Sequence, residues 1–179
     1  LPDDLVVKHV QQVPSDFHAR HSSVRKRYRY LVCNLPYRSP FSRNKSWWVR
    51  KSLNLEAIRE ASSYLMGKHD FSAFRAAACS SPNPNKDLRE ILCDVKPWLH
   101  ANLCLELEAD SFLQHMVRIM VGTLVQVGTG KVEPEQMKRI LESRDRSQAG
   151  LTAPAHGLYA LAVRYPEDRI EWPDELMDS

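Results

Sequence analysis

The hydrophobic period changes within residues 103–128, which read LCLELEADSFLQHMVRIMVGTLVQVG. In the first part of this stretch, Leu103, Leu105 and Leu107 alternate with other residue types, which predicts a strand with one buried face and one open face. In the second part, apolar residues cover a wide arc of a helix from Phe112 to Val127, and two nearby glycines end it. A half-buried strand followed directly by a buried helix indicates a domain of mixed α and β structure.

The rest of the chain supplies further strands and helices. We predict strands at residues 5–13, 27–33, 46–50, 88–98, 101–109 and 157–165, and helices at residues 55–66, 112–127 and 134–143. The segments between these elements are predicted loops, and the longest of them covers residues 69–87. Antiparallel hairpins with helices returning across one face predict an α+β fold, an antiparallel sheet related to ferredoxin-like units.

Length and composition indicate one globular domain with a charged tail. The chain has 179 residues, of which 43% are hydrophobic and 26% are charged, so a disordered or fibrous protein is disfavoured. Residues 167–179 contain six acidic side chains and one arginine, a composition typical of a solvated tail. We therefore divide the chain into a lobe, residues 1–166, and an acidic C-terminal tail, residues 167–179.

The sequence also disfavours several kinds of site and location. The longest unbroken apolar run, Leu158–Val163, is far shorter than the roughly 20 residues that cross a bilayer, so no membrane span is predicted. The four cysteines and seven histidines show no metal-ligand spacing, and no glycine-rich phosphate loop is present, so neither a metal nor a nucleotide cofactor is expected. Widely spaced cysteines indicate free thiols in a reducing compartment, which predicts a cytoplasmic protein.

Basic and aromatic side chains concentrate between Phe17 and Leu55. The basic ones are Arg20, Arg25, Lys26, Arg27, Arg29, Arg38, Arg43, Lys45, Arg50 and Lys51, and no acidic residue lies among them. Seven of the fifteen Phe, Trp and Tyr residues lie in the same segment. Cations that contact phosphates and rings that stack on unpaired bases indicate nucleic-acid binding. The alternative is a solvated basic face with ordinary core aromatics.

Arg118 is the only Lys, Arg, Asp or Glu between Ser111 and Gly130. An arginine in so apolar a helix needs a carboxylate, a phosphate or several carbonyls as partner, because it cannot lose its proton. Alternatively its side chain reaches solvent from the remaining face of the helix, beside His115 and Gln126. His115 itself is either a base or phosphate contact, or a histidine of the helix surface.

Five short motifs occur in order along the chain. They are FHAR at 17–20, KRYRY at 26–30, GKHDFSAFR at 67–75, FLQHMVRIMVG at 112–122 and TAPAHGLY at 152–159. Together they resemble the successive signatures of the tRNA pseudouridine synthase A family over nearly the whole chain. The resemblance implies an enzyme that converts uridines of the tRNA anticodon stem-loop to pseudouridine without a cofactor or metal. It also implies two similar α+β lobes that share one antiparallel sheet, an RNA-binding cleft between them, and a homodimer.

The resemblance further assigns roles to individual residues. Tyr28 corresponds to the aromatic residue that stacks on the target uracil, and Leu158 to an apolar wall beside it. Arg118 corresponds to the arginine that pairs with the catalytic aspartate. The residues that resemble basic positions of the cleft, where they would hold phosphates, are Arg20, Arg25, Lys26, Arg27 and Arg29.

One departure from the family pattern limits what the chain is expected to do. The catalytic aspartate of the family lies in an RTDxG segment of the N-terminal lobe, and this sequence contains no such segment. Asp70 and Asp110 lack the context of a nucleophile. We therefore expect this chain to be the C-terminal lobe, inactive on its own, with an open interlobe face that promotes self-association. The alternative is a stand-alone RNA-binding module without catalysis.

Overall fold

The computed structural model describes residues 1–95 and 102–166 of the chain. Within them it contains six strands and three α-helices. The strands are β1 (Arg25–Cys33), β2 (Trp47–Trp48), β3 (Gly67–Asp70), β4 (Asn85–Asp94), β5 (Leu103–Ala109) and β6 (Leu158–Arg164). The helices are α1 (Leu55–Ser63), α2 (Met116–Gly128) and α3 (Gln136–Ser143). The predicted α+β class is confirmed.

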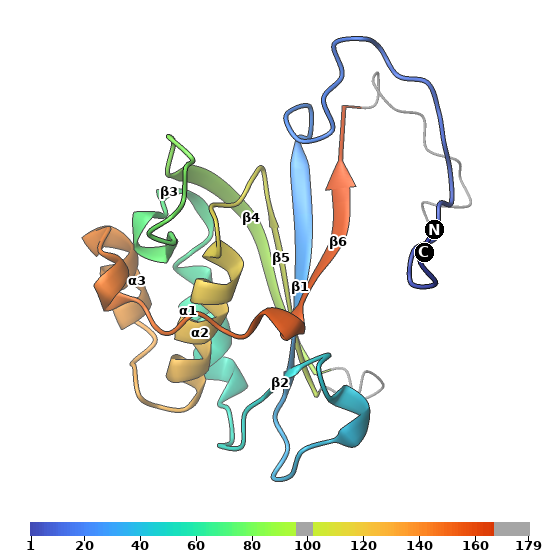
Figure 1. Cartoon of the computed structure of the whole chain (residues 1–179). Helices are drawn as coiled ribbons and strands as arrows, with labels where there is room; N and C mark the ends of the chain where they lie inside the picture. Colours follow the sequence, from blue (N-terminus) through green and yellow to red (C-terminus); the bar gives the residue numbers. More distant parts are fainter. Residues whose placement is uncertain (96–101, 167–179) are drawn as a thin grey trace.

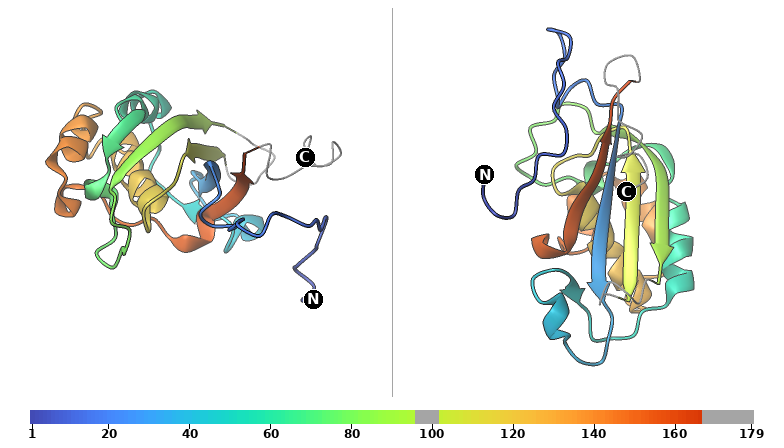
Figure 2. Two further views of the ribbon diagram at one scale, coloured as in Figure 1. Left: turned by 90° about the horizontal axis from the view of Figure 1, so that it is seen from above. Right: turned by 90° about the vertical axis from the view of Figure 1, so that its right-hand side faces the viewer.

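The strands form one sheet in the order β2-β1-β5-β4-β3, with β6 paired to β1. Every pairing is antiparallel except that of β1 with the short β2, which is parallel. The helices lie together on one side of the sheet (Figure 1), and they lie behind it in the right-hand view of Figure 2. Strand β1 is thus an inner strand of the sheet, with one face toward the helices and one face away from them.

The helix-facing side chains of β1 and β5 form the hydrophobic core. Tyr30 and Leu105 are direct cross-strand partners, as are Val32 and Leu103. All four are at most 1% exposed, and they pack in one cluster with apolar side chains of α2. Burial of each such large apolar side chain stabilises the fold by about 1.5–3 kcal/mol. Because this face is fixed by the core, the alternate residues of β1 must point the other way.

Helix α2 begins at Met116, so the predicted start at Phe112 is wrong by four residues. His115 precedes the helix with a φ of 61°, in the left-handed region. Phe112 and Leu113 contact the core from the turn before it, and apolar period alone does not distinguish such a turn from a helix. The segment after α3 lies directly on α2, because a Cβ at Gly122 would come within 1.8 Å of the Leu151 carbonyl oxygen.

Two further predictions from the sequence are wrong. Residues 5–13 do not form the expected strand, and Val6 and Val10 are about 80% exposed (78% and 81%), since none of the described strands pairs with this segment. The loop expected at residues 69–87 includes the second half of β3, a 3₁₀ turn at Ser72–Phe74 and the start of β4. The pairing of β3 with β4 stabilises this segment. The spacing of apolar residues along the sequence does not predict which strands pair in this way.

The remaining elements follow the sequence with small changes of bounds: β1 begins two residues earlier than predicted and β4 three, while β2, β5 and β6 are shorter than predicted. Helices α1 and α3 lie inside the predicted ranges, and the predicted loop at residues 144–157 contains two short 3₁₀ turns, η4 (Arg146–Gln148) and η5 (Ala155–Gly157). The predicted turn between β4 and β5 and the predicted acidic tail fall outside the described residues. None of the helices in the described part of the chain is long and apolar enough to cross a membrane.

Candidate functional site

A cavity of about 630 Å³ lies between β1, the N-terminal end of α2 and the segment that leads into β6. Four of the residues singled out in the sequence line it: Arg20, Tyr28, Arg118 and Leu158. The wall is completed by residues 78–81, residues 112–117 and Ala155. Among the described residues that line the cavity there is no aspartate or glutamate. The cavity wall therefore combines two arginines with polar and apolar side chains.

Tyr28 reaches the cavity because of the alternation of β1. It pairs with Leu107 of β5 on one side and with Ala160 of β6 on the other, so its backbone is held by two neighbouring strands. Its ring contacts Phe112 edge-on, with the ring centroids 5.2 Å apart and an interplanar angle of 88°. A ring fixed at its edge in this way presents a rigid surface on which a planar group can stack.

Arg118 combines features of both alternatives that its sequence context left open. Its Nε donates a hydrogen bond to the Ala153 carbonyl oxygen at 2.6 Å, and the Ala153 N–H donates to the Arg118 carbonyl oxygen at 3.0 Å. The side chain is half-buried and also lines the cavity. No carboxylate in residues 1–95 or 102–166 forms an ion pair with it. A negatively charged group placed in the cavity would find a fixed guanidinium there.

Tyr30 supports the wall of the cavity formed by Ala155 and Leu158, a role that the sequence did not predict. Its hydroxyl donates to the Pro154 carbonyl oxygen at 2.6 Å, and Gly157 lies so close that a Cβ there would come within 2.7 Å of the ring. Burial raises the pKa of Tyr30, and the charge of Arg118 only partly opposes this. The second tyrosine of the KRYRY motif therefore holds turn η5, which carries the chain into Leu158.

Cys79 and His115 also lie at the cavity. The sequence did not single out Cys79 as a site residue, and for His115 it left open a role as base or phosphate contact. Burial alone would raise the pKa of the Cys79 thiol, but N–H groups of Gln114 and Ser81 and the charge of Arg75 lower it overall. Arg75 donates from Nη2 to the carbonyl oxygens of Cys79 and Ser81, at 2.6 and 2.8 Å, and so fixes this wall. His115 is exposed and lies at the start of α2, beside the cavity rather than on the helix surface.

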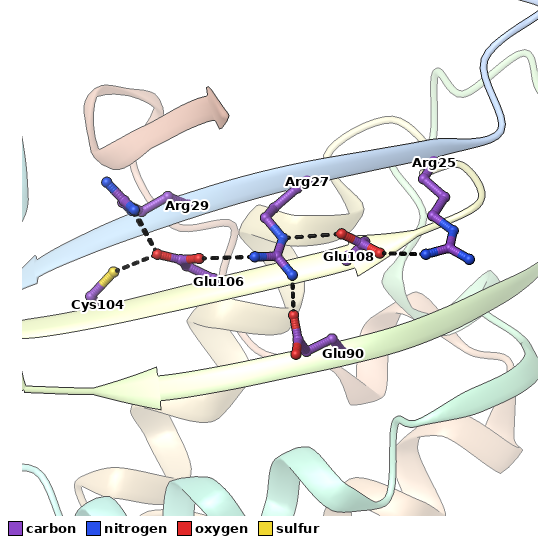
Figure 3. A network of polar contacts seen from close by, with 7 residues as sticks. All are labelled: Arg25, Arg27, Arg29, Glu90, Cys104, Glu106 and Glu108. Atoms are coloured by element: carbon purple, nitrogen blue, oxygen red, sulfur yellow. Dashed lines mark hydrogen bonds and ion pairs between the residues drawn. The ribbon is translucent and has the colours of Figure 1, made fainter. Parts of the chain in front are cut away.

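Three of the other predicted RNA-binding residues point to the opposite face of the sheet. Figure 3 shows them in a network of ion pairs with glutamates of β4 and β5. The members are Arg25, Arg27, Arg29, Glu90, Glu106 and Glu108, with Cys104 at one end. The network covers the face of β5 that was predicted to be open, so that prediction is wrong. Glu106 and Glu108 are each 7% exposed.

The ion pairs follow the register of the two strands. Arg27 lies opposite Glu108 and Arg29 lies opposite Glu106. The Arg29 Nη2 is 2.7 Å from a Glu106 oxygen, the Arg27 Nε is 3.1 Å from a Glu108 oxygen, and Arg27 also pairs with Glu90. Opposite charges on directly facing strand positions stabilise that pairing. The arginine charges on this face are thus already balanced within the lobe.

Lys26 lies on the same face of β1 as Tyr28 by strand alternation, outside the set of residues that line the cavity. The structure thus brings Arg20 to the cavity and leaves Arg25, Lys26, Arg27 and Arg29 outside it. That these four residues hold phosphates stays a prediction.

Asp70 and Asp110 have local structural roles. An Asp70 oxygen accepts the Ser72 N–H at 2.9 Å, and Arg144 lies 3.3 Å away. Burial alone would raise the pKa of Asp70, but Ser72 and the nearby arginines lower it overall. Asp110 accepts the N–H groups of Asp87 and Ser111. Neither carboxylate lines the cavity, and the described residues contain no group of three or more side chains that could hold a metal ion.

A mixed sheet of six strands with three helices on one side is the fold of an α+β pseudouridine synthase lobe. The family profile described as tRNA pseudouridine synthase matches residues 61–166. A protein of Thermoanaerobacter sp. (strain X514) named "tRNA pseudouridine synthase A" is 42% identical over 165 residues, 92% of this chain and 66% of the relative. A protein of the same name from Syntrophotalea carbinolica is 42% identical over 173 residues, 96% of this chain and 67% of the relative.

The chain belongs to the tRNA pseudouridine synthase family. A third relative of that name, from Shewanella sediminis, is 38% identical over 173 residues, which are 97% of this chain and 65% of the relative. The chain thus spans about two thirds of the length of the curated relatives that it matches.

Proposed function

We propose that this chain takes part in the isomerisation of uridine to pseudouridine in the anticodon stem-loop of tRNA. The observation that carries the proposal is the cavity, which brings together Tyr28, Arg118 and Leu158 from three separate motifs. The names of the relatives support tRNA as the substrate. The reaction proposed here needs no cofactor or metal, and the protein acts in the cytoplasm as a homodimer.

The cavity supplies binding and orientation for a nucleotide turned out of its stack. The uracil ring stacks on Tyr28, whose edge is held by Phe112, and Leu158 forms an apolar wall beside it. An aspartate attacks the target nucleotide, the bond from ribose to the ring nitrogen breaks, and the freed uracil rotates. It rejoins the ribose through carbon 5, while the bond between the aspartate and the nucleotide breaks and frees the carboxylate. The proton on carbon 5 is released to solvent, and the ring nitrogen that lost the ribose takes up a proton.

The nucleophilic aspartate is proposed to come from an N-terminal lobe outside these 179 residues. Arg118 has a hydrogen bond to a carbonyl and a position at the cavity, and no carboxylate of the described residues pairs with it. In the completed protein it pairs with that aspartate. Tyr159, Leu161 and Val163 of the outer strand β6 are 37–39% exposed, which supports this strand as the place where a second lobe or subunit packs.

A second candidate function is an RNA-binding module without catalysis. The absence of a carboxylate among the described residues of the cavity favours it. Both functions require RNA to bind at Tyr28, and they differ in whether a completed protein isomerises uridine.

Release of tritium from tRNA labelled at carbon 5 of uracil tests the two functions. The test compares this chain alone with the same chain joined behind the N-terminal lobe of the Thermoanaerobacter relative. We expect no release from the chain alone and release from the joined protein. A folded joined protein that binds tRNA but releases no tritium would contradict the enzyme and leave the RNA-binding module.

The variant Arg118→Met in the joined protein tests the role of the arginine. We expect the turnover number to fall by about a hundredfold or more, the effect of removing one fixed charge from an active site. Lys138→Gln on α3 removes one exposed cation that does not line the cavity, and this control should leave turnover unchanged. Turnover of Arg118→Met equal to that of the unaltered protein would contradict the pairing.

A further inference from the structure

A second cavity, of about 480 Å³, lies on the other side of turn η5. Its volume falls within the range of small-molecule sites, about 300–1,000 Å³. The side chains that give it chemical character are Arg38, Arg43, Trp47, Trp48 and His156, and small polar residues and a proline complete the wall. The described residues that line it include no carboxylate. It therefore combines cations with aromatic rings, and no role has been assigned to it so far.

The indoles of this cavity are held in place by the fold. The Trp48 Nε1 donates to the Leu35 carbonyl oxygen at 3.1 Å, and the Trp47 ring contacts Tyr30 at right angles, with centroids 6.5 Å apart. The Arg38 guanidinium carbon lies 4.7 Å from the centroid of the Trp48 ring. The planar guanidinium of Arg38 thus covers one face of Trp48. The two indoles form a fixed surface that suits stacking.

The cations around this cavity differ from those of the sheet network. Residues 34–54 contain five basic side chains and no acidic one. Arg38 and Arg43 are exposed, and no carboxylate of the described chain forms an ion pair with either. The neighbouring rings of Tyr37 and Phe41 are 69% and 74% exposed. Cations that no carboxylate balances, next to exposed rings, suit a ligand with both phosphates and bases.

The two cavities share one wall. Ala155 lines the first cavity and the next residue, His156, lines the second. Both belong to the single turn η5, which Tyr30 holds through the Pro154 carbonyl oxygen. Tyr30 also contacts Trp47 of the second cavity. A ligand that enters both cavities must therefore be long enough to cross this turn, and a polynucleotide meets that condition.

We propose that the second cavity binds one unpaired nucleotide next to the target uridine in the RNA. Its base packs against the Trp48 indole, and its phosphate is held by Arg38 and Arg43. This inference rests on the proposed function, because it takes RNA as the ligand of the first cavity. The binding of a flanking nucleotide would help to hold the target uridine over Tyr28 and would favour substrates with an unpaired neighbour.

Salt dependence of RNA binding tests the cationic part of the site. The probe is a fluorescein-labelled anticodon stem-loop RNA, titrated with the chain at several salt concentrations. The double variant Arg38→Gln/Arg43→Gln should lower the slope of log affinity against log salt by about 1.4, or 0.7 for each lost phosphate contact. The matched pair Lys131→Gln/Arg139→Gln removes two exposed cations near α3 and should leave the slope unchanged. Equal slopes for both pairs would overturn the proposal.

Photo-crosslinking gives the position of the nucleotide. RNA with 4-thiouridine at one position beside the target uridine should crosslink to residues 38–48 or His156, and Trp48→Leu should weaken binding about five- to a hundredfold. A crosslinked peptide from elsewhere would overturn the site even if Trp48→Leu failed to fold. If the unaltered chain bound no RNA, the proposed function would fail as well. If Tyr28→Ala weakened binding while the cavity variants did not, only this subsite would fail.

Discussion

Strand β1 presents tyrosines to the helices on one face of the sheet and arginines on the other, and the two faces differ in how their polar groups are satisfied. On the tyrosine face, Tyr28 and Tyr30 serve a cavity whose cations have no carboxylate partner among the described residues. On the arginine face, Arg27 and Arg29 bind glutamates that lie directly opposite on β5. Alternate residues of a single motif thus build a site and a structural network.

The comparison shows that a basic segment is not by itself a binding surface. What matters is whether the fold provides a carboxylate for each cation. Arg118 and Arg38 lack one in the described part of the chain, whereas Arg27 has three glutamates nearby, at Glu90, Glu106 and Glu108. A charge that is already paired and hydrogen-bonded gains less from a phosphate than one that is not.

The largest expected effect on stability comes from removing a buried carboxylate from the ion pairs of the arginine face. Glu106→Ala leaves Arg27 and Arg29 without a shared carboxylate that is only 7% exposed. We expect the free energy of unfolding to fall by about 3 kcal/mol, the lower end for a broken buried pair because the arginines are partly exposed. Urea denaturation measures this. The surface pair of Glu56 with Arg59 is the control, and Glu56→Ala should cost less than about 0.5 kcal/mol.

The second-largest expected effect on stability concerns a close contact on the tyrosine face. A Cβ at Gly157 would lie 2.7 Å from the Tyr30 ring, so Gly157→Ala should lower the free energy of unfolding by about 1–3 kcal/mol. Adding Tyr30→Leu removes the ring atoms that cause the clash. In a double-mutant cycle by urea denaturation, the double variant should therefore lose less unfolding free energy than the sum of the losses in the two single variants. Strict additivity would show that the ring is not the cause.

The smallest effect concerns pH. Burial raises the pKa of Tyr30 above its ordinary value of about 10, so the unfolded chain loses this proton first as the pH rises. The stability that the neutral hydroxyl contributes is complete below pH 10, and we expect it to fall above pH 10 by up to about 1.4 kcal/mol per pH unit. Tyr30→Phe should remove this part of the pH dependence and cost about 1 kcal/mol at neutral pH. Parallel stability curves for the two proteins above pH 10 would contradict it.

The elements and motifs that depend on local pattern were predictable from the sequence. Strand alternation placed Tyr28 and Arg27 on opposite faces of the sheet. The family resemblance of the motifs assigned Tyr28, Arg118 and Leu158 to one site, and all three line the same cavity. The start of α2 at Met116 was not predictable, because the apolar residues before it pack into the core from a turn. The supporting role of Tyr30 depends on Pro154 and Gly157, which are far away in the chain.

The burial of Glu106 and Glu108 could not be read from the sequence for a related reason. The alternation of leucine and glutamate in β5 is the pattern of an exposed face. The arginines that cover these glutamates come from β1, more than 70 positions earlier in the chain, and only the register of the two strands brings them together. The missing strand at residues 5–13 has the opposite cause, since a segment with suitable residues finds no partner among the strands that the structure describes.

The affinity of the chain for a labelled anticodon stem-loop RNA tests most directly whether RNA binds at the tyrosine face. Tyr28→Ala should weaken binding about five- to a hundredfold through the lost stacking, and Tyr28→Phe should retain most of it. Arg29→Gln/Glu106→Gln removes the ion pairs of Glu106 with Arg29 and Arg27 from the other face at constant net charge, and its affinity should stay close to that of the unaltered chain. Loss of binding in this pair with no change in Tyr28→Ala would contradict the account and place RNA on the arginine face.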